Sequence, residues 1–131
     1  MLERSRFWAT VPVADLERAK AFYRDALGLT PVVETAAWLT FRAGDGYFQL
    51  YPTRYAGTAE HTLGSWVVDD IEAAVAELRR HGVRFEEYDF PDLKTVGGIA
   101  DLGGVERAAW FRDSEGNILS ISQFLVDATG S

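Results

Sequence analysis

The sequence predicts an α+β fold made of two βαβββ modules in one chain, with mixed sheets curling around a cleft and helices on the outside. A motif recurs at an offset of 55 residues, because residues 13–19 (Val-Ala-Asp-Leu-Glu-Arg-Ala) align with residues 68–74 (Val-Asp-Asp-Ile-Glu-Ala-Ala). Each copy follows an apolar segment, opens a stripe of apolar residues at helical spacing and precedes short strand-like segments. Each half therefore has the order strand, helix, strand, strand, strand, which favours helices on one face of a mixed sheet.

Apolar stripes predict two helices, over residues 16–26 and 71–78. An aspartate precedes each stripe, where an N-cap side chain accepts a hydrogen bond from a free backbone N–H group. A glycine follows each stripe, where a left-handed residue ends a helix. We interpret these residues as caps that specify the fold rather than the chemistry: Asp15 and Gly28 for the first helix, Asp70 (or Asp69) and Gly82 for the second.

Short segments rich in β-branched and aromatic residues predict four strands in each half. Compact turns are expected at residues 43–46 and 113–117, since Gly and Asn tolerate a positive φ. The expected strands are residues 8–13, 31–34, 37–42 and 47–51 in the first half, and 63–68, 84–88, 108–112 and 118–124 in the second. Module one covers about residues 7–52 and module two about residues 61–125, within a single domain over residues 1–131.

The glycine-rich segment 91–104 is expected to be a connection without strands. It is longer than the usual connection of about 4–6 residues, and long loops often cover a ligand. A lid at the edge of the cleft and a plain flexible loop are both open interpretations.

Side-chain alternation divides each strand into a helix-packing face and a cleft face. In the first strand, Ala9 and Val11 suit packing against the helix, which leaves Trp8 and Thr10 on the cleft side. The sequence alone does not fix the faces of Trp38 and Trp110. A lining of aromatic rings and hydroxyl groups suits a small-molecule ligand. The candidate ligand-binding residues are Trp8, Thr10, Tyr47, Gln49, Tyr51, His61, Leu63, Ser65, Trp110, Ser120 and Ser122.

Three motifs carry a resemblance to a known family: residues 13–29 (Val-x-Asp-Leu-Glu-Arg-Ala-x-x-Phe-Tyr-x-x-x-Leu-Gly-Leu), 68–74 (Val-x-Asp-Ile-Glu-x-Ala) and 111–118 (Phe-Arg-Asp-Ser-Glu-Gly-Asn-Ile). They resemble the vicinal oxygen chelate superfamily, which includes glyoxalase I, extradiol dioxygenases, fosfomycin resistance enzymes and bleomycin resistance proteins. The resemblance covers about residues 8–124. It implies the fold more strongly than an activity, because function resides in the site.

The resemblance also implies four strand positions at which enzymes of this family bind a divalent metal ion. In this sequence they hold Trp8, Gln49, Leu63 and Ser120. Gln49 alone has a side chain that could coordinate an ion, and its amide oxygen is a weak neutral donor. Catalytic Zn or Fe sites use strong His or carboxylate ligands. We therefore expect no metal ion and no other cofactor.

His61 is expected to be a histidine at the end of a strand, with a polar cleft residue as the next interpretation. It lies two residues before Leu63 and would share its face on a continuous strand. The alternative function is a glyoxalase-like or dioxygenase-like enzyme with an atypical or metal-free active site. Such an enzyme would use groups such as His61, Asp101 or Glu106 for acid–base chemistry.

Composition excludes several classes of protein. Cysteine is absent, which removes disulfides and thiolate metal sites. The formal net charge is −7, with 20 acidic against 13 basic residues, so a nucleic-acid role is not expected. No apolar run reaches the ~20 residues that span a bilayer, and the first residues do not resemble a signal peptide. We expect a cytoplasmic protein that binds neither nucleic acid nor membrane.

These observations favour metal-independent binding or sequestration of a small molecule in the cleft. The aromatic lining suits an aromatic ligand, and the negative net charge favours a cationic one. The resemblance to bleomycin resistance proteins implies the same function. It also implies a homodimer whose clefts include residues from the second subunit.

Overall fold

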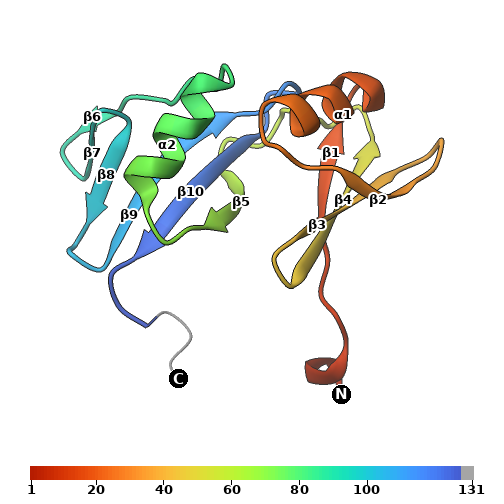
Figure 1. Cartoon of the computed structure of the whole chain (residues 1–131), viewed down its shortest axis with the longest axis horizontal. Coiled ribbons are helices and arrows are strands. Elements are labelled where there is room, and N and C mark those ends of the chain that lie inside the picture. Colours follow the sequence, from red (N-terminus) through yellow and green to blue (C-terminus); the bar gives the residue numbers. More distant parts are fainter. Residues whose placement is uncertain (128–131) are drawn as a thin grey trace.

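The computed structural model describes residues 1–127 and consists of two β-sheets and two α-helices (Figure 1). The four-stranded sheet has the strand order β1-β4-β3-β2, and the six-stranded sheet has the order β5-β10-β9-β8-β7-β6. The first module contains a 3-10 helix (Leu2–Arg4), β1 (Ala9–Val13), α1 (Leu16–Asp25), β2 (Pro31–Glu34), β3 (Leu39–Ala43) and β4 (Gly46–Pro52). The second contains β5 (Thr62–Val67), α2 (Ile71–Arg80), β6 (Asp89–Phe90), β7 (Leu93–Val96), β8 (Ile99–Leu102), β9 (Glu106–Arg112) and β10 (Ile118–Phe124).

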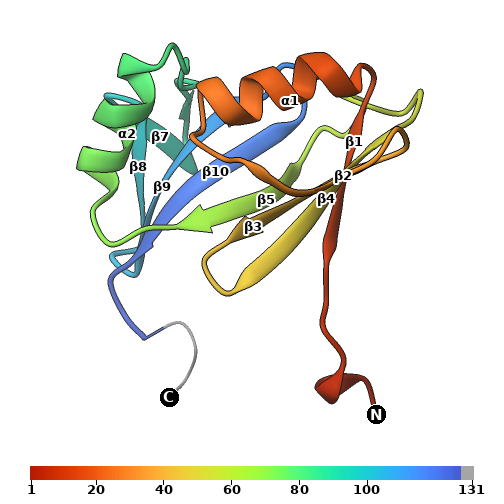
Figure 2. The same cartoon turned by 45° about the vertical axis from the view of Figure 1, so that its right-hand side comes forward.

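The repeat predicted from the sequence is confirmed by the strand order. β1 runs parallel to β4, with Ala9 opposite Phe48, and β5 runs parallel to β10, with Ser65 opposite Ser120. The strands β5, β10, β9 and β8 take the places that β1, β4, β3 and β2 take in the other sheet. α1 packs against β4 of the four-stranded sheet, and α2 packs against β9 and β10 of the six-stranded sheet (Figure 2). The fold is therefore the predicted α+β arrangement of two βαβββ modules.

The predicted helix caps are confirmed. The Asp15 carboxylate accepts a hydrogen bond of 3.0 Å from the Arg18 amide, and Asp70 accepts one of 3.1 Å from the Ala73 amide. Gly28 has a φ of +72°, the left-handed conformation expected after α1.

The expectation of an unstructured connection over residues 91–104 is wrong. The segment forms the antiparallel strands β7 and β8, in which Val96 lies opposite Ile99. Gly97 and Gly98 form the two-residue turn between them, with φ values of +60° and +83°. A type I′ hairpin turn requires a positive φ at both central residues, which two glycines adopt without strain.

The strand expected over residues 84–88 is reduced to a single bridge between Phe85 and Phe111. β8 pairs with residues 106–108 of β9, so only the far end of β9 is left for this segment. There the Glu86 amide donates to the Trp110 carbonyl at 2.7 Å. The β7–β8 hairpin therefore occupies part of the β9 edge with which a full strand over residues 84–88 would pair.

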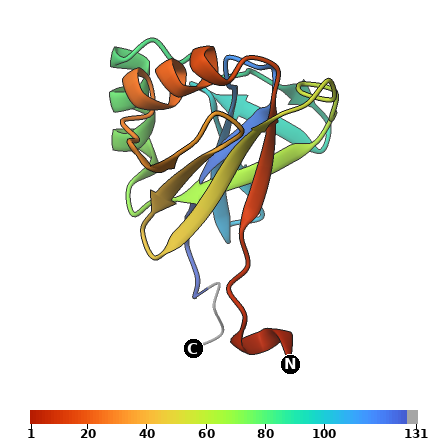
Figure 3. The same cartoon turned by 90° about the vertical axis from the view of Figure 1, so that its right-hand side faces the viewer.

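The helix-side faces of both sheets pack into one hydrophobic core. Phe41 and Leu50 of the four-stranded sheet and Phe111 of the six-stranded sheet are fully buried in it. The rings of Phe48 and Trp66 meet edge to face at 5.9 Å and connect the two sheets. Figure 3 shows the four-stranded sheet in front, with strands of the six-stranded sheet behind it. The opposite face of each sheet therefore points away from the shared core.

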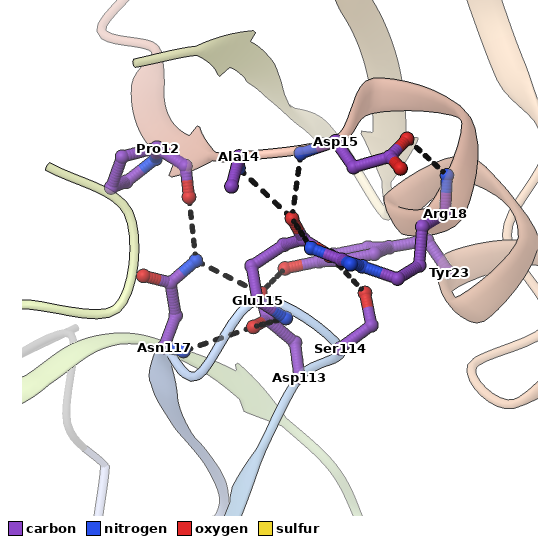
Figure 4. Close-up of polar contacts among 9 residues, drawn as sticks. All are labelled: Pro12, Ala14, Asp15, Arg18, Tyr23, Asp113, Ser114, Glu115 and Asn117. Atoms are coloured by element: carbon purple, nitrogen blue, oxygen red, sulfur yellow. Dashed lines mark hydrogen bonds and ion pairs between the residues drawn. The ribbon is translucent and has the colours of Figure 1, made fainter. Parts of the chain in front are cut away.

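The turn at residues 113–117 joins the second module to the start of α1 (Figure 4). The Glu115 carboxylate accepts hydrogen bonds of 2.9 Å from both the Ala14 and Asp15 amides, and the Arg18 Nε donates to it at 2.8 Å. Burial acts to raise the pKa of Glu115, but the hydrogen bonds from Arg18, the Asp15 amide, Ser114 and the Ala14 amide outweigh it and lower this pKa to about 2. Glu115 therefore stabilises α1 as a carboxylate supplied by the other module.

Asn117 and Asp113 make further contacts between the modules. The Asn117 side-chain amide donates to the Pro12 carbonyl at 2.7 Å and accepts from the Gly57 amide at 3.1 Å. The Tyr23 hydroxyl of α1 donates to Asp113 Oδ2 at 2.7 Å (Figure 4). Burial, and then the Asp113 carboxylate, raise the pKa of Tyr23 well above its usual value, so the hydroxyl keeps its proton as a donor.

Replacing Tyr23 with Phe is expected to lower the free energy of unfolding by about 1–2 kcal/mol, because a buried carboxylate oxygen loses a donor. Asn117 Nδ2 still donates to the same oxygen at 3.0 Å, which limits the loss. Urea denaturation at pH 7 measures the difference. The control is Tyr51→Phe at an exposed ring, for which a change within about 0.5 kcal/mol is expected. Equal effects of the two substitutions would contradict this role of Tyr23.

Candidate functional site

The outer face of the four-stranded sheet carries the predicted cleft residues of the first module. We call it the aromatic face and define it by Trp8, Thr10, Tyr47, Gln49 and Tyr51. Trp8 and Tyr47 stack with their ring centroids 5.3 Å apart, and Thr10 lies opposite Gln49 in the strand register. Trp8 and Tyr51 are 37% and 38% exposed. This face is open to a ligand or to another chain.

Trp38 lies just before β3, and extending the pairing of β3 with β4 by one residue places it opposite Tyr51. The antiparallel pairing of β3 with β4 places Leu39 opposite Leu50, so the preceding residue falls beside Tyr51. Trp38 is 39% exposed. The aromatic face therefore gains a further ring that alternation in the sequence did not assign.

The outer face of the six-stranded sheet carries the predicted cleft residues of the second module. We call it the hydroxyl face and define it by Thr62, Ser65, Trp110, Ser120 and Ser122. The hydroxyl groups of Ser65 and Ser120 are hydrogen-bonded to each other. Trp110 lies opposite Ser120 in the register, and its indole N–H donates to the Thr62 hydroxyl at 3.1 Å. The structure thus places Trp110 beside the predicted serines.

Tyr88 and Phe90 extend this face with two more rings. Tyr88 meets Trp110 edge to face at 5.7 Å and stacks on Phe90 at 6.1 Å. Burial and then the Glu86 carboxylate raise the pKa of Tyr88, while Arg112 acts against them, so the phenol stays protonated and able to donate. Sequence reasoning did not select these two rings. The short spacing of aromatics at residues 88 and 90 was the available indication.

Thr62 was not among the candidate residues predicted from the sequence. Leu63 was predicted to line the cleft, but it packs against the core. A register shift separates the Ile118–Thr62 pair from the Leu119–Gly64 pair, so one extra residue of β5 lies between them. This bulge places Thr62 on the same face as Ser65 and lets Leu63 pack against the core. His61 is exposed just before β5, with its Nδ1 3.1 Å from the Thr62 carbonyl oxygen.

The two faces lie on opposite sides of the shared core in one chain. Within residues 1–127, no ring contact or side-chain hydrogen bond joins a residue of the aromatic face to one of the hydroxyl face. A cavity of about 200 Å³ opens between β1, β4 and β5, on the core side. Of the candidate residues, it is lined only by Tyr47, Leu63 and Ser65.

The four positions implied for a metal ion do not form a donor set. Trp8 and Gln49 lie on the aromatic face, Leu63 packs against the core, and Ser120 is bonded to Ser65. Over the part of the chain that the structure describes, no three His, Asp or Glu side chains come together in a way that could hold an ion. The residues present therefore do not fit the metal ion that the family resemblance implies.

A family model described as the Glyoxalase/Bleomycin resistance protein/Dioxygenase superfamily matches residues 7–121. The chain belongs to this superfamily. The match begins at Phe7, before β1, and ends at Ile121 within β10, so it covers both modules except the last residues of β10. No curated protein matches the sequence significantly. Within residues 1–127, the helices of this superfamily member lack the length and hydrophobicity needed to span a membrane.

Three solved structures of similar fold extend the comparison. The bleomycin resistance determinant encoded on transposon Tn5 has a TM-score of 0.71 at 18% identity, covering 93% of this chain and 99% of its own. The antibiotic-binding protein TnmS3 from Streptomyces sp. CB03234 has a TM-score of 0.62 at 22% identity, covering 95% and 98%. The lactoylglutathione lyase from Agrobacterium tumefaciens has a TM-score of 0.65 at 19% identity, covering 92% and 93%. At these identities the likeness shows the fold, which a resistance determinant, an antibiotic-binding protein and a lyase share.

Proposed function

We propose that this superfamily member binds and sequesters a small aromatic molecule without a metal ion. The proposal depends on the side chains that this chain has at the positions where enzymes of the family bind a metal ion. Trp8 is stacked on Tyr47, Leu63 is packed against the core, and Ser120 is hydrogen-bonded to Ser65. An indole ring and a hydroxyl group at two of these positions suit stacking and hydrogen bonding rather than coordination. The similar bleomycin resistance determinant and the similar antibiotic-binding protein support a binding function.

The binding cleft is proposed to form between two copies of the chain. The aromatic face of one copy and the hydroxyl face of the other would be its walls. A two-fold symmetric pair brings these faces together twice, so the outer faces of both sheets are covered at once. On the hydroxyl face, Ser120 and Ser122 are already only 3% exposed within one chain. Exposed apolar residues flank the walls, since Val33 on the first sheet is 47% exposed and Val67 on the second is 65% exposed. Light scattering is expected to give twice the mass of the chain.

Replacing Trp8 with Ala is expected to weaken binding of the neutral probe 2-naphthamide about three- to tenfold, because one ring of the stack is lost. Isothermal titration calorimetry measures the dissociation constant. Tyr55→Ala is the matched control, because this ring is 59% exposed but lies in the loop after β4. Equal affinity in Trp8→Ala and in the unaltered protein, or no binding of any planar aromatic compound, would count against the proposal.

Elemental analysis tests the metal-independent part of the proposal. Protein purified without a metal-binding tag is expected to contain far less than one equivalent of Zn, Ni, Fe or Mn, and to bind the probe equally well after treatment with a chelator. A near-stoichiometric metal ion would favour the alternative of a glyoxalase-like or dioxygenase-like enzyme.

A further inference from the structure

One end of the aromatic face carries two arginines around a pair of rings. Tyr47 stacks on Trp8, and the guanidinium carbon of Arg6 lies 5.3 Å from the centre of the Tyr47 ring. Arg42 lies directly opposite Tyr47 in the antiparallel pairing of β3 with β4. Directly opposed side chains lie on one face of a sheet with their Cβ atoms ~5 Å apart. Two cations therefore flank the stacked rings.

Neither cation is neutralised within the described residues. Arg42 Nε donates to the carbonyl oxygen of Gly44 at 3.2 Å, and Arg6 contacts the Tyr47 ring. No ion pair joins either guanidinium to a carboxylate in residues 1–127, although Asp45 lies in the adjacent turn. The chain has 20 acidic and 13 basic residues, so two arginines without acidic partners on one face are a local departure from its overall charge.

In the second module, the arginine at the corresponding position forms an ion pair with a carboxylate. Arg112 lies opposite Ile118 in β10, as Arg42 lies opposite Tyr47 in β4. Arg112 Nε is paired with the Glu86 carboxylate at 3.2 Å. The repeat therefore places an arginine at corresponding positions of both sheets, but only the second module supplies its counter-ion.

A guanidinium without an acidic partner, next to an aromatic ring, suits a ligand that combines a carboxylate with a planar ring. Its N–H groups form a planar fork that matches a carboxylate, and a neighbouring ring provides a stacking surface. Charges more than about 8 Å away are largely screened at physiological salt, so these two arginines affect a bound ligand more than the net charge of the chain does. The local charge favours an anion, in contrast to the cation that the overall charge suggested.

We propose that the aromatic face selects planar aromatic molecules that carry a carboxylate or similar anionic group. The ring of the ligand stacks beside Trp8 and Tyr47, and its anionic group lies between Arg6 and Arg42. This inference rests on the proposed binding function and names the class of ligand for that site.

Three probes of the same shape test the selection: 2-naphthoate, 2-naphthamide and 2-naphthylmethylammonium. Calorimetry at low salt is expected to show that 2-naphthoate binds about fivefold more tightly than 2-naphthamide, and that the cation binds most weakly. The preference is expected to shrink at 0.5 M NaCl. Backbone chemical shifts of Trp8 and Tyr47 should change on addition of 2-naphthoate.

Variants separate charge selection from stacking. Arg42→Gln and Arg6→Gln are each expected to lower the ratio of the 2-naphthoate affinity to the 2-naphthamide affinity, from about five toward one. Arg54→Gln is the matched control, because Arg54 also lies near an aromatic ring, 4.9 Å from the centre of Tyr55, but belongs to the loop after β4 and not to the aromatic face. The preference should survive in this variant.

The outcomes distinguish this inference from the function on which it rests. If the three probes bind equally, or if the cation binds best, the selection of anions is wrong while the binding function stands. A preference for 2-naphthoate that persists in Arg42→Gln and Arg6→Gln would also overturn it. If no probe binds, both the inference and the proposed binding function fail.

Discussion

Replacing Glu115 with Gln is expected to lower the free energy of unfolding by about 2–3 kcal/mol at pH 7. The Glu115 side chain is fully buried, and its carboxylate accepts hydrogen bonds from two backbone amides of the other module and from Arg18. A fall in its pKa from 4.5 to about 2 corresponds to about 3 kcal/mol of stabilisation of the charged form. A glutamine retains one acceptor oxygen but loses the charge, so the helix terminus and Arg18 lose their anionic partner.

The same carboxylate makes stability depend on pH. Because folding lowers the pKa of Glu115, its contribution is complete well above the unperturbed value of 4.5 and is lost as the pH falls toward 2. Urea denaturation at a series of pH values from 7 to 2.5 measures this loss. The difference between the unaltered protein and Glu115→Gln should be largest near pH 7 and should shrink as acid is added.

Glu72→Gln provides a control for the loss of any surface carboxylate. Glu72 forms a 3.2 Å ion pair with Arg107 but is 71% exposed, so its replacement should cost less than about 0.5 kcal/mol. A Glu115→Gln variant as stable as Glu72→Gln, or a pH profile identical to that of the unaltered protein, would contradict the role assigned to Glu115.

Replacing Gly57 with Ala is expected to cost about 3 kcal/mol or more. Gly57 has a φ of +70°, and an added Cβ would lie 2.4 Å from the Glu115 carbonyl oxygen. The contact atom belongs to the backbone of the turn that joins the modules, so it cannot move aside without disturbing that junction. The cost combines ~1–2 kcal/mol for a left-handed alanine with a steric overlap.

Gly44→Ala separates these two contributions. Gly44 has a similar φ of +57°, but a Cβ added there meets no atom within 4 Å. This variant should lose only ~1–2 kcal/mol. Thermal and urea denaturation of both variants measure the difference, and similar losses would show that the close approach at Gly57 does not matter.

The sequence predicts those elements whose determinants are local. Asp15 and Asp70 act on amides three residues away, so a single stretch of sequence contains the whole signal for each helix start. The hairpin at Gly97 and Gly98 is equally local, but a glycine-rich segment is typical of a loop as well as of a tight turn. Paired glycines between apolar residues favour the two-residue turn that the structure shows.

Long-range contacts were less predictable. The turn at residues 113–117 was recognised, but the sequence gives no indication that Glu115 binds amides 100 residues away or that Gly57 packs on its backbone. Alternation placed Tyr47, Gln49 and Ser120 on the outer faces. It failed at Thr62 and Leu63, because the bulge in β5 shifts the pattern by one residue. The separation of the two faces by a shared core depends on how the modules pack, which no pattern within one module encodes.

The proposed cleft between two copies is tested most directly by combining two defective variants. Trp8→Ala alters the aromatic face and Trp110→Ala alters the hydroxyl face. Each homodimer is expected to bind 2-naphthamide weakly, because every cleft contains one altered wall. In a heterodimer isolated by co-expression with two different tags, one cleft has both altered walls and the other has none. Calorimetry should therefore recover one site of normal affinity in each heterodimer. A heterodimer without such a site would contradict the account.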